Sequence, residues 1–129
     1  MIKRRDLIFG IIPISVLPSF LFAKEKIREE DEFFTGKVNL PDATRWYKNG
    51  KLHRVDAPAV EYASDNKFWY RNGKIHRDDG PAVEWANGDK EWFRNGKRHR
   101  EDGPAVECAD GRKYWYREGK RLNNYKRVY

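Results

Sequence analysis

Residues 69–91 read WYRNGKIHRDDGPAVEWANGDKE, and closely related stretches lie on both sides of them. Residues 46–68 read WYKNGKLHRVDAPAVEYASDNKF, and residues 92–114 read WFRNGKRHREDGPAVECADGRKY. A fourth copy, WYREGKRLNNYKRVY, begins at Trp115 and then diverges. The tryptophans that begin the copies are 23 residues apart. One copy alone buries too little, so the core must become continuous through stacking of three or more copies.

Turn signals divide each copy into short segments. The signals are Asn49-Gly50, Asn72-Gly73, Asn95-Gly96, Asp79-Gly80-Pro81, Asp102-Gly103-Pro104, Asn87-Gly88 and Asp110-Gly111. Asn-Gly permits positive φ at both central positions, as a type I′ hairpin requires. The segments between the turns, such as KFWYR (67–71) and PAVEW (81–85), are four to six residues long and predict strands. We therefore predict an all-β fold, an antiparallel single-sheet meander of stacked 23-residue β-hairpin repeats.

The repeat period places equivalent aromatic side chains in columns along the stack. The first column contains Trp46, Trp69, Trp92 and Trp115, and the second contains Tyr47, Tyr70, Phe93 and Tyr116. Because side chains alternate along a strand, the two columns point to opposite faces. Rings on an open face would stack on sugars or bases, whereas rings on a covered face are core. We favour core for the Trp column and keep both columns as a possible binding surface.

A polar block, His-Arg-x-Asp, follows each Asn-Gly turn. Its members and the turn glycines are Gly50, Gly73, Gly96, His53, His76, His99, Arg54, Arg77, Arg100, Asp56, Asp79 and Asp102. A catalytic site needs one convergent arrangement, so equivalent copies favour a structural role. In that role, Arg pairs with a carboxylate and Asp accepts backbone N–H groups. A zinc site would need about four ligands near 2 Å, so we predict no catalytic residue, metal or cofactor.

Another column contains Glu61, Glu84 and Glu107. Paired carboxylates can act in glycosidases. These glutamates recur on a regular strand among many lysines and arginines, so we predict cross-strand ion pairs instead. The one cysteine, Cys108, occupies the repeat position of Tyr62 and Trp85 and most simply replaces a packed aromatic. A reactive thiol or an intermolecular bridge is the alternative.

An aromatic pair, NGK, HR and a glycine-bearing strand at period 23 resemble the MORN repeat and its bacterial variants, over about residues 40–122. The resemblance implies an array of β-hairpins. Two features depart from the usual repeat: Arg54, Arg77 and Arg100 stand where a glycine is usual, and a DGPAVE block follows. Lipid and partner binding vary among MORN-like proteins, so the resemblance implies no particular ligand.

The chain divides into three predicted parts. Residues 1–23 predict an export signal, because a basic start precedes LIFGIIPISVLPSFLFA, which is short for a spanning helix. KRRDLI resembles a twin-arginine motif, although an ordinary secretory signal also fits. A cut after Ala23 is expected, but Leu21 is bulky for a cleavage site, so an uncleaved anchor stays open. Residues 24–36 predict a charged linker, and residues 37–129 a repeat domain of about 3.5 copies.

These features predict an exported, non-catalytic module for protein interaction or scaffolding in the cell envelope, periplasmic or secreted. One alternative is a carbohydrate or cell-wall module that uses exposed aromatic columns. Another is an antitoxin or immunity role, which rests only on the MORN resemblance. The expected partner is a protein or an envelope polysaccharide, with membrane contact possible through an uncleaved N-terminal segment. The net charge of +7 is modest, and basic and acidic residues are interspersed along the sequence, so we do not expect nucleic acid to bind.

Fusing residues 1–30 to a reporter that works only outside the cytoplasm should give an active reporter. If the route is twin-arginine, replacing Arg4 and Arg5 by lysine abolishes that activity. Reporter assays in cells check both points. Full activity after the double replacement would exclude the twin-arginine route and leave the general one.

Overall fold

The computed structural model describes residues 33–123. Within that range the chain forms fifteen strands and no helix, so the predicted all-β fold is confirmed. The strands are β1 (Gly36–Asn39), β2 (Ala43–Lys48), β3 (Lys51–Leu52), β4 (Val60–Tyr62), β5 (Lys67–Phe68), β6 (Tyr70–Arg71), β7 (Lys74–Ile75), β8 (Val83–Glu84), β9 (Lys90–Glu91), β10 (Phe93–Arg94), β11 (Lys97–Arg98), β12 (Val106–Glu107), β13 (Lys113–Tyr114), β14 (Tyr116–Arg117) and β15 (Lys120–Arg121).

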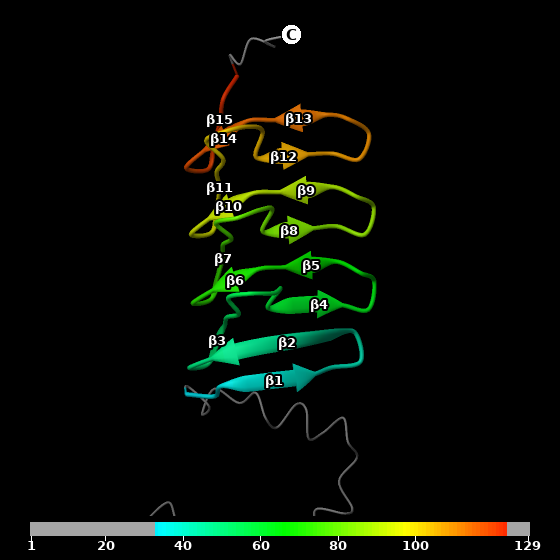
Figure 1. The fold of residues 1–129 in the computed structure, drawn as a ribbon, viewed down its shortest axis with the longest axis vertical. Coiled ribbons are helices and arrows are strands. Elements are labelled where there is room, and N and C mark those ends of the chain that lie inside the picture. The colour runs from blue at the N-terminus through cyan, green and yellow to red at the C-terminus, as the bar shows by residue number, and fades with distance from the viewer. Residues whose placement is uncertain (1–32, 124–129) are drawn as a thin grey trace, which may run out of the picture.

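The strands form a stack of hairpins along the long axis of the molecule (Figure 1). The main sheet runs β1-β2-β4-β5-β8-β9-β12-β13, and β3 pairs with β2 at one side. All paired strands are antiparallel. The short hairpins β6–β7, β10–β11 and β14–β15 are separate two-stranded sheets along the opposite side of the stack. A full copy such as 69–91 therefore contributes one hairpin to each side.

The tryptophan that begins each copy is the corner between these two sides. The N–H of Trp69 donates to the carbonyl of Ala82 at 2.8 Å, while its own carbonyl accepts from the N–H of His76 at 3.0 Å. The backbone thus changes partner from the main sheet to the short hairpin at this residue. The predicted length of four to six residues is therefore wrong for segment 67–71. It is split into β5 and β6, two residues each.

The interior is lined by small side chains. Ala82 is 0% exposed and its neighbour Val83 is 2% exposed, and the pair Ala59 and Val60 repeats this burial. Successive residues of an extended chain point to opposite sides, so both sides of this segment are covered. Burial is thus built up by stacking rather than by large aliphatic residues.

The Asn-Gly turns have the predicted geometry. Asn72 has φ 50° and Gly73 has φ 78°, so both central residues of the loop between β6 and β7 are left-handed. The loop between β14 and β15 has the same geometry with Glu118 in place of asparagine, at φ 47°. These two-residue turns match the twist of the hairpin strands that they connect.

The packed region begins before the predicted boundary at residue 37. The ring of Phe34 lies 5.9 Å from that of Tyr47, and its carbonyl accepts from the N–H of Gly50 at 2.7 Å. β1 already begins at Gly36. The predicted export signal (1–23), most of the predicted linker and residues 124–129 lie outside the described residues.

Gly73→Val should lower the free energy of unfolding by at least about 1–2 kcal/mol, because the left-handed region penalises an L-residue and a β-branched one more. Lys74→Val, in the strand of the same hairpin, is the control and should change stability by about 0.5 kcal/mol or less. Urea unfolding measures both. Equal effects of the two substitutions would contradict the left-handed requirement.

Candidate functional site

The arginine of each polar block joins several parts of its own copy. The guanidinium carbon of Arg77 lies 4.2 Å from the ring centroid of Trp69. Its Nε donates to Asp79 at 2.9 Å, and its terminal nitrogen donates to the carbonyl of Pro81 at 3.1 Å. The same nitrogen lies 3.4 Å from Glu84. The arginine therefore fastens the tryptophan corner, the Asp-Gly-Pro bend and the following strand together.

The next copy repeats this arrangement. Arg100 lies over Trp92 at 4.0 Å and bonds Asp102 at 3.0 Å, the carbonyl of Pro104 at 3.1 Å and Glu107 at 2.8 Å. The predicted pairing of arginine with a carboxylate of its own copy is therefore confirmed at both positions. Equivalent geometry in successive copies is the behaviour of a structural element.

The first copy has a looser version. Arg54 lies 3.3 Å from the carbonyl of Pro58 and 3.5 Å from Glu61. Ala57 stands where later copies carry glycine. A Cβ atom built at Gly80 would lie only 3.1 Å from the guanidinium carbon of its arginine. The first copy therefore combines an alanine at this position with slightly longer arginine contacts.

The histidines join successive copies. Nδ1 of His76 lies 3.1 Å from the backbone N–H of Asn95, and Nε2 lies 2.8 Å from Asp78. A ring that accepts at Nδ1 and donates from Nε2–H satisfies these two contacts, whereas the contact of Nδ1 with the side-chain oxygen of Asn95 at 3.0 Å needs a proton on Nδ1. The equivalent Nδ1 contacts are His53 with Asn72 N–H at 3.0 Å and His99 with Glu118 N–H at 3.2 Å. Each histidine thus caps the turn of the next copy.

Other groups take this place where no histidine is available. The N–H of Asn49 donates to the hydroxyl of Thr35 at 2.9 Å, so a threonine caps the first turn. In the fourth copy, Leu122 occupies the histidine position, 23 residues after His99.

Among residues 33–123, no group of three or more His, Cys, Asp or Glu side chains could hold a metal ion.

The wide turns of the main sheet are linked in the same manner. The side-chain oxygen of Asn66 accepts from the N–H of Ala86 at 2.8 Å, and that of Asp89 accepts from the N–H of Ala109 at 2.7 Å. Both sides of the stack are therefore held by a side chain of one copy that accepts a backbone N–H of the next.

The glutamate column lies in a ladder of alternating charge. Across the main sheet, the register places residues opposite one another in the order Glu61, Lys67, Glu84, Lys90, Glu107, Lys113. Opposite charges in cross-strand positions are stabilising. The glutamates also approach the arginines of their own copies, as with Arg100 and Glu107 at 2.8 Å.

Neither aromatic column is an exposed face. Trp69 is 7% exposed, and the other seven members of the two columns are half-buried. An arginine guanidinium lies 4.0 Å from the ring of Trp46, as its equivalents do in the next two copies. Burial raises the pKa of the Tyr70 phenol, so the second column is also partly withdrawn from water. These positions agree with the interior role that we favour for the Trp column.

Among the repeat positions within residues 33–123, the exposed aromatic is Trp85, which was not predicted as a site residue. It is 38% exposed, and its Nε1–H donates to Glu91 at 3.0 Å. Its ring lies 5.3 Å from that of Phe68. The sequence did contain a signal for it: this repeat position holds a different residue in each copy, namely Tyr62, Trp85 and Cys108.

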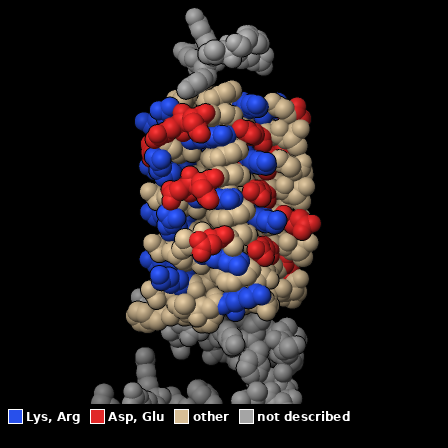
Figure 2. Space-filling view, viewed as in Figure 1, with Lys and Arg blue, Asp and Glu red and all other residues tan. Residues whose placement is uncertain are grey.

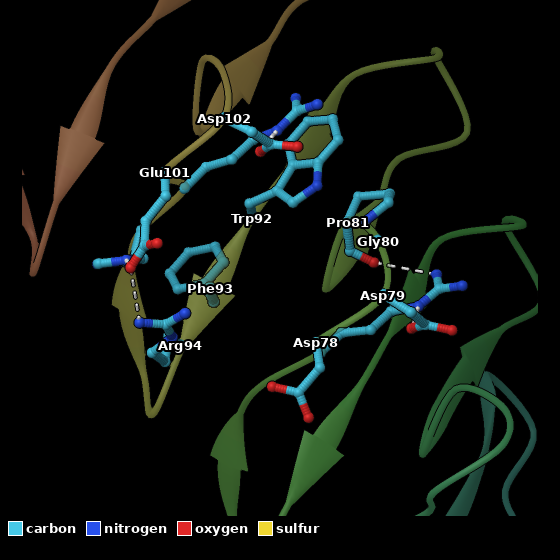
Figure 3. Close-up of a pocket in the computed structure, with 12 residues that line it drawn as sticks. Asp78, Asp79, Gly80, Pro81, Trp92, Phe93, Arg94, Glu101 and Asp102 are labelled. Atoms are coloured by element: carbon cyan, nitrogen blue, oxygen red, sulfur yellow. Dashed lines mark hydrogen bonds and ion pairs between the residues drawn. The ribbon is translucent and has the colours of Figure 1, made fainter.

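A concave site of about 590 Å³ lies between the second and third copies (Figure 3). Trp92 and Phe93 line its centre, with Pro81 beside them. Four carboxylates lie around it, from Asp78, Asp79, Glu101 and Asp102. We call this site the acidic groove.

The carboxylates of the acidic groove are exposed but held by hydrogen bonds. His76, followed by Arg71, lowers the pKa of Asp78. His99 and Arg94 lower the pKa of Glu101 in the same manner. Asp78 and Glu101 were not among the predicted site residues, because their position is Val55 in the first copy and so does not recur.

Comparison with protein-family models, curated proteins and solved structures gives no significant match. The resemblance to the MORN repeat therefore stays a prediction. Over the described residues, the chain has no helix with the length and apolarity needed to cross a membrane.

Arg77→Lys should lower the free energy of unfolding by about 2 kcal/mol. Lysine keeps the charge but loses the planar contact with Trp69 and the forked hydrogen bonds. Arg112→Lys is the matched control, because Arg112 pairs with Asp110 at an exposed turn and such pairs contribute about 0–1 kcal/mol. Urea unfolding of the two variants compares them. Similar, small effects would contradict the central role of Arg77.

Proposed function

We propose that this chain is an exported, non-catalytic interaction module that holds a protein partner in the cell envelope. The acidic groove is the observation that carries the proposal. It combines a partly apolar floor, Trp92 and Phe93, with carboxylate side chains around it. Such a combination suits the side chains of a partner protein, because aromatic rings supply contact area and rim charges supply orientation.

The engagement of the recurring polar groups supports a binding role over catalysis. The arginine and histidine of the second copy are both held in contacts within or between copies, as Arg77 with Pro81 and His76 with Asn95. A nucleophile or general base needs a group directed at substrate instead. Hydrogen bonds lower the pKa values of Asp78, Asp79 and Glu101, which suits charge recognition better than proton transfer near neutral pH.

The expected partner presents a basic segment. Asp78, Asp79, Glu101 and Asp102 give the groove four negative charges, against the three positive charges of its arginines. A lysine or arginine of the partner would lie between the two carboxylate pairs and over the edge of Phe93. Export, taken from residues 1–23, would place this encounter outside the cytoplasm.

A carbohydrate partner is the second candidate. The specific observation in its favour is Trp85, which is 38% exposed, rather than the two columns that are half-buried or buried. Phe68 packs edge-on against Trp85 and would support its ring. Loss of glycan binding in Trp85→Ala would identify this route.

A photo-reactive amino acid in place of Phe93 should cross-link to a defined protein in living cells, because this position lies in the acidic groove. The cross-link should disappear in Asp78→Asn/Glu101→Gln, which removes two of the charges. Identification of the adduct by mass spectrometry should show a lysine- or arginine-rich segment.

The same photo-reactive group in place of Ala109, on an exposed wide turn, is the matched control. It should give no cross-link to that protein. An adduct at both positions, or one unaffected by the charge substitutions, would contradict recognition through the groove.

A further inference from the structure

The Asn-Gly hairpins carry a second surface, which is basic. In each hairpin, the residues flanking the turn are directly opposite one another and both positively charged. The pairs are Lys48 with Lys51, Arg71 with Lys74, Arg94 with Lys97, and Arg117 with Lys120. Like charges directly opposite in a hairpin are destabilising. Every copy in the described part of the chain therefore retains a cross-strand pair of like charges that the hairpin itself does not require.

One member of each pair forms a continuous column. These residues, Lys51, Lys74, Lys97 and Lys120, are all exposed, and we call them the lysine line. The lysines lie against the next turn, since a Cβ atom built at Gly73 would be 3.7 Å from that of Lys51. Each copy adds two strands to the main sheet, so adjacent lysines are separated by about 10 Å. The strands that begin with these lysines, β3, β7, β11 and β15, lie one above another along the long axis of the stack (Figure 1).

The lysine line is not neutralised by its neighbours. Arg71 pairs with Asp78 at 2.7 Å and Arg94 pairs with Glu101 at 3.3 Å. No ion pair in the described part of the chain involves Lys51, Lys74, Lys97 or Lys120. The nearby acids thus compensate the arginines and leave the lysine ammonium groups to bind an outside anion.

The charges on the array are arranged in stripes. Figure 2 shows columns of basic and acidic side chains that alternate across one face and run along the stack. Acidic side chains lie directly beside the basic hairpins, because Asp78 pairs with Arg71 and Glu101 pairs with Arg94. An anion that binds the lysine line must therefore be narrow and elongated.

We propose that the lysine line binds a linear anionic polysaccharide laid along the stack. A chain of carboxylate- or sulfate-bearing sugars presents regularly spaced charges and is thin enough to avoid the neighbouring acidic side chains. A membrane surface or a nucleic acid duplex would also cover those side chains and be repelled by them. A single nucleic acid strand would need exposed rings for its bases, and the rings of these hairpins are half-buried, with Arg98 over Phe93.

This proposal does not rest on the acidic groove, and its test is separate. The probes are polygalacturonate and heparin, titrated into the full-length protein by calorimetry at several salt concentrations. The test variant is Lys51→Gln/Lys74→Gln/Lys97→Gln. The matched control is Lys67→Gln/Lys90→Gln/Lys113→Gln, which removes the same charge from the exposed lysines that lie opposite glutamates in the main sheet.

The test variant should bind at least one of the two polysaccharides about a hundredfold more weakly, at roughly fivefold per lysine. Its slope of log affinity against log salt should fall by about two to three. The control should lose less than about threefold. Because the test variant removes like-charge pairs, it should unfold at the same or a higher urea concentration, so weaker binding is not loss of the fold.

Two further comparisons can overturn the proposal. Equal losses in the test and control variants would show that net charge alone attracts the polysaccharide. Tighter binding to a DNA duplex or to anionic lipid vesicles than to either polysaccharide would assign the line to that partner instead. Asp78→Asn/Glu101→Gln removes charges of the acidic groove and leaves the lysine line intact. It should therefore bind polysaccharide at least as tightly as the wild type, even though it should lose the protein cross-link. The two proposals can thus fail separately.

Discussion

The stack depends on a half-buried arginine guanidinium that holds the parts of one copy together. Arg77 lies against Trp69, reaches the carbonyl of Pro81 and meets two carboxylates. Because the buried aliphatic side chains among residues 33–123 are alanines and valines, a planar group with several donors replaces the large apolar side chain that a thicker core would use. Gly80 follows from this choice, since a Cβ atom there would press on the guanidinium. Glycine thus suits the arginine at this bend, and the first copy, which carries Ala57 there, has the longer arginine contacts.

Stacking adds a second requirement, because the N–H groups of left-handed turns need acceptors. His76 supplies one to Asn95, and Asn66 supplies one to Ala86 on the other side. Both acceptors lie about 20 residues before their donors, so each copy completes the next. Thr35 performs the same function with a shorter side chain at the first turn.

Sequence reasoning predicted the all-β class, the type I′ turns and the structural use of the polar block, because each depends on local chemistry or on the period. It could not predict that strands break at Trp69, since a change of strand partner depends on which neighbours the stack supplies. It also overlooked Thr35 and Asn66, whose acceptor role appears only when two copies are adjacent. Asp78, Glu101 and Trp85 were missed because the predicted sites were chosen among residues that recur in every copy, and recurring residues are mainly those that the fold requires.

Positions that recur in every copy therefore differ in role from positions that vary between copies. Residues that recur and have partners, such as His76 and Arg77, are explained by folding. The position that holds Val55 in the first copy and Asp78 in the second differs between copies, so the architecture does not fix its side chain and it can serve recognition at one place in the array. The lysine that follows each Asn-Gly turn belongs to neither group, because Lys74 recurs, is exposed and lies opposite another cation. Such a pair of like charges is not required by the hairpin, and its recurrence is the observation that supports the proposed ligand, whose own charges would repeat along the same axis.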